Sequence, residues 1–238
     1  MRYFPQYSQI IKIVLTQLKK TGIIPVLNAE KLNCGLFGSG PCPEAYGIAQ
    51  FIDANLPECR AVQSISFDIN ASSWEYSRNI THHSLIPAIF GHRAFGIKAV
   101  DFDLTIPISI ESFNDRMSKM NLIVFQNCLN ETNPNQHMQV LQNLKTIYDN
   151  LSSGTLLIFI DLSGFSNVKR LLSTFQSQVK PDNIVEPLND ASKRYFAADL
   201  VNTMPQILRT NLLNGNRDNQ NGLIPRVNID YHTLIIKK

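Results

Sequence analysis

A short glycine turn stands at the point of the chain where residue types and spacing could do chemistry. The apolar run Leu36–Phe37 leads into Gly38, Ser39 and Gly40, and Pro43 follows. Glycine lets a backbone turn sharply and lets its amides approach a ligand closely. Proline suits the first position of a helix, where its missing N–H costs no hydrogen bond. The pattern predicts a strand, a tight turn and a helix, with turn amides open to an anionic or hydroxyl group. A tight turn that binds no ligand is the alternative.

Acidic residues follow the next two apolar runs. Asp68 comes directly after Val62–Phe67, and Asp103 comes directly after Ile97–Phe102. Ligands of open α/β sheets bind at the carboxyl ends of the strands, so we expect both carboxylates at the ligand crevice. Asp68 is suited to accept both hydroxyls of a ribose. Asp103 is suited to accept a bond from an adenine amino group, or else to cap a turn.

Polar residues also follow the fourth apolar run, Leu122–Phe125. Asn127 and Glu131 lie in this segment, where a substrate could reach them, and they are the candidates for groups on the acceptor side. The alternative is that they cap the helix expected near Gln136. No other residue stands out as catalytic.

Two common phosphate-binding patterns do not fit the glycine turn. The dinucleotide fingerprint needs a third glycine where this chain has Pro43. The acid Asp68 also lies 28 residues beyond Gly40, rather than the roughly 20 of that fingerprint. A Walker loop would need Gly-Lys-Ser/Thr after the turn, which is absent. A nicotinamide dinucleotide or a nucleoside triphosphate is therefore disfavoured.

Strand-like and helix-like patterns alternate along most of the chain. The near-continuous apolar runs that predict buried parallel strands are Cys34–Phe37, Val62–Phe67, Ile97–Phe102, Leu122–Phe125 and Leu156–Ile160. The helical patterns between and after them are Pro43–Ala54, Trp74–Phe90, Ser109–Met120, Gln136–Leu151 and Asn167–Gln178. The alternation predicts an α/β fold with a Rossmann-like, doubly wound sheet. The half-polar final strand, Arg226–Ile236, should be antiparallel, because no crossover helix follows it.

The N-terminal and C-terminal parts of the chain indicate how it divides into domains. Residues Tyr7–Lys20 show helical spacing, which predicts an N-terminal helix before the first strand. Residues 1–30 are read as a helical extension and residues 31–238 as one Rossmann-like domain. The polar run Asn214–Gly222 reads as a loop within that domain.

Composition, net charge and cysteine spacing indicate which kinds of binding partner are unexpected. With 238 residues, 44% hydrophobic and 17% charged, the chain has the make-up of an ordinary globular protein, and its net charge of +3 is too small to indicate nucleic acid. The four cysteines form no Cys-x-x-Cys pair, so no metal site is expected. No membrane span or signal peptide is visible, which predicts a cytoplasmic protein. The oligomeric state stays open.

The ordered set of motifs resembles class I S-adenosylmethionine-dependent methyltransferases over residues 31–165. Leu36–Cys42 is similar to the family's first motif, with Cys42 where the family often has a third glycine. Asp68 matches the ribose-binding acid, Asp103 the adenine-side acid and Gln126–Asn130 the fourth motif. The resemblance implies S-adenosylmethionine as cofactor, with the following binding residues: Gly38, Ser39, Gly40, Asp68, Ile69, Asp103 and Asn127. It implies a transferase that moves a methyl group in line, and we expect a small-molecule acceptor.

A similarity over two shorter segments suggests that a different group of the cofactor is transferred. Gly38–Pro43 together with Phe67–Asn70 resembles nicotianamine synthases, which use the same cofactor for aminocarboxypropyl transfer. A methyltransferase-like domain that binds without turnover is the third possibility. The sequence identifies neither the acceptor molecule nor the acceptor atom.

Overall fold

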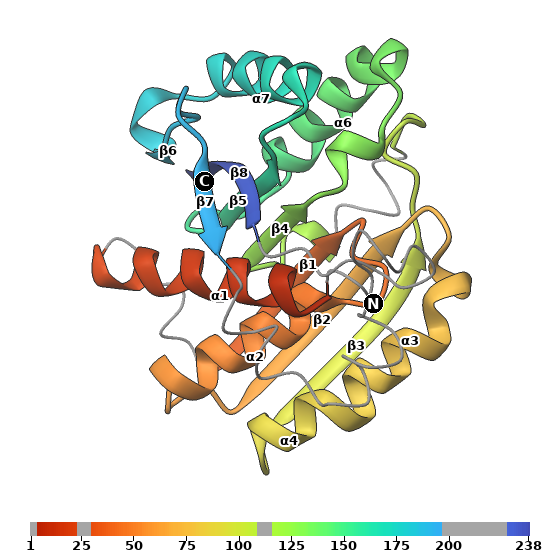
Figure 1. Ribbon diagram of the computed structural model, residues 1–238, viewed down its shortest axis with the longest axis vertical. Coiled ribbons are helices and arrows are strands. Elements are labelled where there is room, and N and C mark those ends of the chain that lie inside the picture. The colour runs from red at the N-terminus through yellow and green to blue at the C-terminus, as the bar shows by residue number, and fades with distance from the viewer. Residues whose placement is uncertain (1–3, 23–29, 109–115, 197–227) are drawn as a thin grey trace, which may run out of the picture.

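The computed structural model describes residues 4–22, 30–108, 116–196 and 228–238, which form a central sheet with helices on both faces (Figure 1). The strands are β1 (Lys31–Phe37), β2 (Ala61–Asp68), β3 (Ala94–Asp101), β4 (Leu122–Gln126), β5 (Leu156–Leu162), β6 (Ile184–Glu186), β7 (Lys193–Phe196) and β8 (Asn228–Lys237). The longer helices are α1 (Phe4–Lys20), α2 (Pro43–Asn55), α6 (His137–Asp149) and α7 (Ser166–Ser177).

The strands are ordered β3-β2-β1-β4-β5-β8-β6, and β7 pairs with β8 at one end of the sheet. The first five strands are parallel, whereas β8 is antiparallel to both β5 and β6. Both predictions, a parallel sheet and an antiparallel final strand, are confirmed. The order reverses at β1, which lies between β2 and β4. A crevice at the carboxyl ends of these strands is expected from that reversal.

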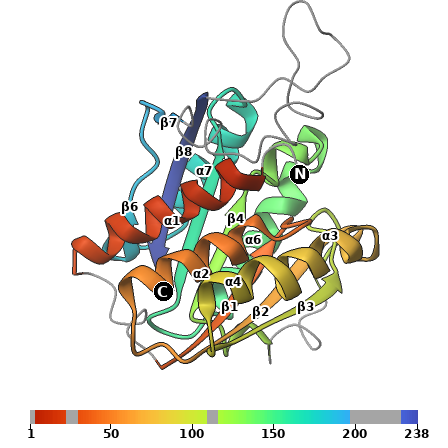
Figure 2. The same ribbon diagram turned by 60° about the horizontal axis from the view of Figure 1, so that its bottom comes forward.

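Each strand of the sheet centre contributes to two cores. In β4, Leu122 and Val124 belong to the core under α1 and α2 (Figure 2), while Ile123 and Phe125 belong to the core under α6 and α7. Successive side chains of a strand point to opposite faces, so a strand covered on both sides is apolar at every position. This double coverage explains why the sequence shows unbroken apolar runs.

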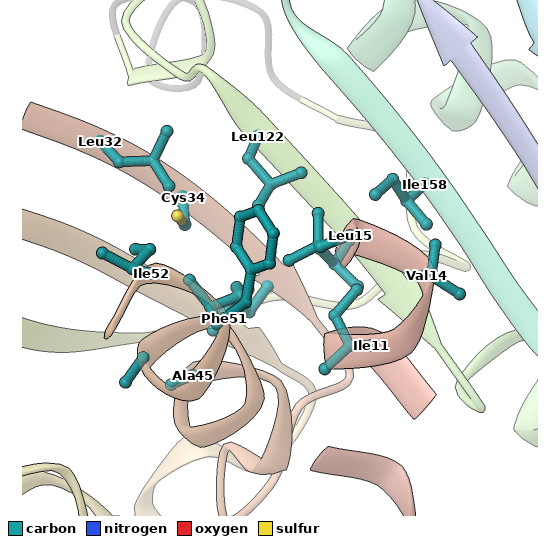
Figure 3. Close-up of a cluster of buried hydrophobic side chains, with 14 of the residues drawn as sticks. Ile11, Val14, Leu15, Leu32, Cys34, Ala45, Phe51, Ile52, Leu122 and Ile158 are labelled. Carbon is teal, nitrogen blue, oxygen red and sulfur yellow. The ribbon is translucent and has the colours of Figure 1, made fainter. Parts of the chain in front are cut away.

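The N-terminal helix α1 is part of the first of these cores. Figure 3 shows Leu15 of α1 and Phe51 of α2 directed toward Leu122 of β4 in one buried cluster. Close contact with α2 depends on Gly47, where an added Cβ would lie 2.2 Å from the carbonyl oxygen of Ser8. The division into an extension of residues 1–30 and a domain of residues 31–238 remains a prediction.

The predicted helix Trp74–Phe90 is present but interrupted. It consists of α3 (Glu75–Ile80), a π-helical turn (Thr81–Leu85) and α4 (Ile86–Phe90). Pro87 has no N–H to bond to the preceding turn, and wider turns accommodate such a missing bond. The predicted helix at Ser109–Met120 falls largely outside the described residues, and the predicted loop at Asn214–Gly222 falls entirely outside them.

Two parts of the architecture were not predicted. The strands β6 and β7 contain three and four residues, too few for a period to be seen in the sequence. Both are held by pairing with β8, which is distant in the chain.

Among the described residues, no helix has the length and apolar character needed to cross a membrane.

Candidate functional site

The glycine turn connects β1 to α2 as the sequence predicted. Gly38 and Gly40 have φ values of +60° and +45°, a left-handed conformation that glycine adopts without steric cost. The amide of Gly38 donates to the carbonyl oxygen of Phe67 at 2.7 Å, which fastens the turn to β2. Cys42 also has a φ of +60°, which is unusual for a residue with a side chain. A tight turn with α2 starting at Pro43 is therefore present.

The protein's own side chains fill the space beside both glycines. A Cβ on Gly38 would lie 2.2 Å from the Cβ of Cys128, and one on Gly40 would lie 3.2 Å from the Trp74 ring. The absence of side chains at these two glycines therefore allows the loops after β1, β2 and β4 to pack against one another, and packing alone explains it. The sequence predicted turn amides open to a ligand, with a tight turn that binds no ligand as the alternative. In the structure the amides of Gly38 and Gly40 donate to Phe67 and Asp68, so these two amides are not open to a ligand.

Asp68 ends β2 and ties the glycine turn to that strand. Its Oδ2 accepts a hydrogen bond from the Gly40 amide at 2.9 Å, and its Oδ1 accepts one from the Asn70 amide at 3.1 Å. The side chain is buried, with the residue 6% exposed. Each carboxylate oxygen carries two lone pairs, so these bonds leave acceptor capacity on both oxygens.

Asp103 lies two residues beyond the end of β3, not directly at it, because the strand ends at Asp101. Its Oδ1 accepts hydrogen bonds from the amide and the hydroxyl of Thr105, at 2.8 and 2.6 Å. These bonds are those of a turn cap, which was the alternative for this residue. Asp101 accepts a bond from the amide of Ala71 at 3.0 Å.

Asn127 follows β4 in a left-handed conformation, with φ of +54°. The residue is 8% exposed, and neither its Oδ1 nor its Nδ2 has a hydrogen-bond partner among the described residues. The alternative that Asn127 caps the next helix is wrong, because Asn133 caps the turn before α6. Buried polar atoms are nearly always paired, so this amide needs a partner.

Asp161 of β5 holds the loop that carries Asn127 and Glu131. Its Oδ2 accepts bonds from the amides of Leu129 and Asn130, at 3.1 and 3.3 Å. Burial raises the pKa of Asp161 to about 7, although these bonds oppose the rise. This residue was not predicted from the sequence. Its signal was an acid inside an otherwise apolar strand.

Glu44, in the first turn of α2, is a second buried acid that the sequence analysis did not place at the site. The residue is 2% exposed, and its Oε2 has no hydrogen-bond partner in the part of the chain that the structure describes. Burial raises the pKa of Glu44 to about 8, and the charge of Asp68 adds to the rise. A helix N-terminus favours the ionised form. Here burial outweighs that effect.

Apart from Cys42, Asp101 and Asp161, the acids and turn residues described above line one cavity of about 680 Å³, within the size range of small-molecule sites. Asp68 and Asp103 both line it, as expected for two carboxylates at the carboxyl ends of the strands, and Gly38 and Asn127 line it too. The remaining predicted residues that line it are Ser39, Gly40, Ile69 and Glu131.

Other lining residues refine what the cavity can do. Trp74 lies against the turn, and Cys128 lies opposite Gly38. Burial raises the pKa of the Cys128 thiol well above its usual value, which keeps it uncharged and a poor nucleophile. No group of three or more potential metal ligands occurs among the residues that the structure describes.

Comparisons with known proteins concern the fold alone. No family model matches the chain, and no curated protein matches it. Solved structures similar to it include the CurJ carbon methyltransferase, at 17% identity and a TM-score of 0.38, covering 61% of this chain and 33% of that one. An S-adenosylmethionine-dependent methyltransferase from Clostridium acetobutylicum has 13% identity and a TM-score of 0.40, covering 79% of this chain and 60% of that one.

A putative methyltransferase from Streptococcus mutans, SMU.1697c in complex with SAH, has 12% identity and a TM-score of 0.46, with coverage of 87% and 89%. This chain thus spans about a third and three fifths of the first two proteins, and most of the third. The chain is similar in structure to many S-adenosylmethionine-dependent methyltransferases. The assignment of a Rossmann-like fold rests on the strand order and strand directions described above.

Proposed function

We propose that the protein is an S-adenosylmethionine-dependent methyltransferase that acts on a small molecule. The observation that carries the proposal is the joining of the glycine turn to the acid at the end of β2. The bond from the Gly40 amide to Asp68 fixes both at the cavity, at the point where the strand order reverses. Nucleotide-like ligands bind at such reversal points in open α/β sheets.

The residues present fit this cofactor. Asp68 retains acceptor capacity for two ribose hydroxyls. The buried amide of Asn127 has no partner among the residues that the structure describes, and a ligand would supply one. The turn Gly38–Gly40, with Asp68, Ile69, Asp103 and Asn127, would hold the cofactor. When bound, S-adenosylmethionine supplies an electrophilic methyl carbon. The protein's own tasks are then to position the acceptor and to exclude water.

Binding calorimetry tests the proposal at Asp68. We expect S-adenosylmethionine or S-adenosylhomocysteine to bind, and Asp68→Ala to weaken binding by roughly 1.5–3 kcal/mol, the scale of hydrogen bonds to a charged group. Asp182→Ala is the matched control, since Asp182 is exposed and is not among the residues lining the cavity. Equal affinities for the wild type and Asp68→Ala would remove Asp68 from the site.

Product analysis tests which bond of the cofactor breaks. Methyl transfer leaves S-adenosylhomocysteine, whereas aminocarboxypropyl transfer leaves methylthioadenosine. We expect S-adenosylhomocysteine to accumulate with turnover once an acceptor is supplied. Methylthioadenosine appearing in step with turnover would contradict methyl transfer, and cofactor binding with neither nucleoside formed would favour a binding domain.

A further inference from the structure

The charge of the cavity lining has one sign. Four carboxyl side chains line it, from Glu44, Asp68, Asp103 and Glu131, and its described lining includes no lysine, arginine or histidine. Burial, followed by the charge of Asp68, raises the pKa of both Glu44 and Glu131. Like charges near one another disfavour ionisation, and a cation relieves this repulsion. The lining therefore favours a positively charged ligand.

The polar atoms of the lining are not equally engaged. Asp68 and Asp103 already accept hydrogen bonds from backbone amides. Within residues 4–22, 30–108, 116–196 and 228–238, Glu44 Oε2 and both polar atoms of the Asn127 side chain have no hydrogen-bond partner, although both residues are more than nine-tenths buried. An unpaired polar atom away from water is costly, so these atoms mark the place where a ligand's polar group is missing.

The carboxyl of Glu44 lies among groups that line the same cavity. Its pKa responds to the charge of Asp68, and its own charge raises the pKa of Cys128 and Cys42. Asp68 ends β2, and Cys128 follows β4 next to Asn127. Glu44 lines the cavity beside the glycine turn, and Asn127 and Cys128 line it from the loop after β4.

We propose that the acceptor is an amine, and that its cationic amino group binds to the carboxyl of Glu44 and to Oδ1 of Asn127, which leaves Asn127 Nδ2 for the cofactor. The inference rests on the proposed function, because it assigns the second ligand of that site. S-adenosylmethionine carries one net positive charge, which is fewer than the carboxyl groups in the lining. An ammonium group donates up to three hydrogen bonds and accepts none, which suits Glu44 Oε2 and Asn127 Oδ1.

The proposal makes binding of the amine release a proton. With a pKa of about 8, Glu44 is mostly protonated at pH 7 in the free protein. A bound cation favours the carboxylate, so Glu44 gives its proton to the buffer as the amine binds. This linkage gives a readout that does not depend on catalysis.

The test uses pentylamine as the probe, with pentanol as its uncharged counterpart, and follows binding by NMR to the protein saturated with S-adenosylhomocysteine. We expect the wild type to bind pentylamine but not pentanol, and Glu44→Gln to bind the amine at least about tenfold more weakly, the loss of one charged bond. Glu75→Gln makes the same change of charge at an exposed residue outside the lining and should bind like the wild type.

The outcomes separate this inference from the proposed function. Absence of S-adenosylhomocysteine binding contradicts the proposed function, and the amine is then titrated into the free protein. Equal amine affinity of the wild type and Glu44→Gln overturns the amine site, as does a Glu44→Gln variant that loses S-adenosylhomocysteine instead. If Glu44→Gln does not fold, calorimetry of the wild type in two buffers decides: release of about one proton on amine binding supports the site, and no release overturns it.

Discussion

At position 38 of the site, both the backbone conformation and the packing require glycine. Gly38 combines a φ of +60° with a contact that leaves no room for a Cβ, which would lie 2.2 Å from the Cβ of Cys128. We expect Gly38→Ala to lower the free energy of unfolding by about 2–5 kcal/mol, from the left-handed backbone and from overpacking together. Urea denaturation followed by circular dichroism measures the loss.

Two variants separate these causes. Gly96→Ala places the same methyl group where no atom lies within 4 Å and where φ is not left-handed, so it should change stability much less. Adding Cys128→Gly to Gly38→Ala removes the overlapping Cβ and should recover the packing part of the loss. A Gly38→Ala variant as stable as Gly96→Ala would contradict this account of the turn.

Part of the site, Asp68 and the glycine turn, was predicted from residue types in the sequence. Asp68 and the glycine turn were found because each lies at the end of an apolar run, and strand ends meet at one edge of a parallel sheet. Glu44 and Asp161 were not assigned to the site. Their importance comes from burial and from neighbours more than 20 residues away, such as Asp68 beside Glu44, and no local pattern records such contacts.

At the scale of elements, the crossing of α1 and α2 depends on Gly47. A Cβ there would lie 2.2 Å from the Ser8 carbonyl oxygen and 2.4 Å from Cγ2 of Ile11. Alanine is a better helix former than glycine by about 1 kcal/mol, but overpacking costs about 1–3 kcal/mol and a backbone oxygen cannot rotate away. We expect Gly47→Ala to lower Tm, measured by thermal denaturation. A higher Tm would mean that α1 does not pack closely on α2.

Element types were predicted better than element details. The apolar runs identified the five parallel strands because both faces of the sheet are covered. The π-helical turn before Pro87 could not be read from periodicity, since it results from a missing N–H inside an otherwise regular helix. The strands β6 and β7 were not predicted from the sequence, because their pairing with β8, and not their composition, makes them strands.

At the scale of the whole molecule, alternation of strands and helices predicted the parallel sheet, but not which strands are neighbours. The reversal that places β1 between β2 and β4 is set by where each crossover helix packs. That reversal creates the cavity and gathers the four carboxyls in its lining. Burial of two acids, Glu44 in the lining and Asp161 in β5, gives the fold a dependence on pH, which can be measured on the whole protein.

Burial raises the pKa of Glu44 from 4.5 to about 8 and that of Asp161 from 3.8 to about 7. The folded protein therefore holds protons that the unfolded chain releases between these values. Stability linked to these groups is fully present below about pH 4 and is lost as pH rises through 7 and 8. We expect the free energy of unfolding to fall between pH 5 and pH 8, by at most about 1.4 kcal/mol per pH unit for each group.

Glu44→Gln isolates the share of one group, because glutamine is uncharged at every pH and has the shape of the protonated acid. Urea denaturation at pH 5.5, 7 and 8.5 should give a flatter dependence for Glu44→Gln than for the wild type, with the largest gain in relative stability at pH 8.5. Glu75→Gln, at an exposed position, should run parallel to the wild type. Parallel curves for the wild type and Glu44→Gln would mean that Glu44 is ionised in the folded protein, and the expected proton release on amine binding would then be absent too.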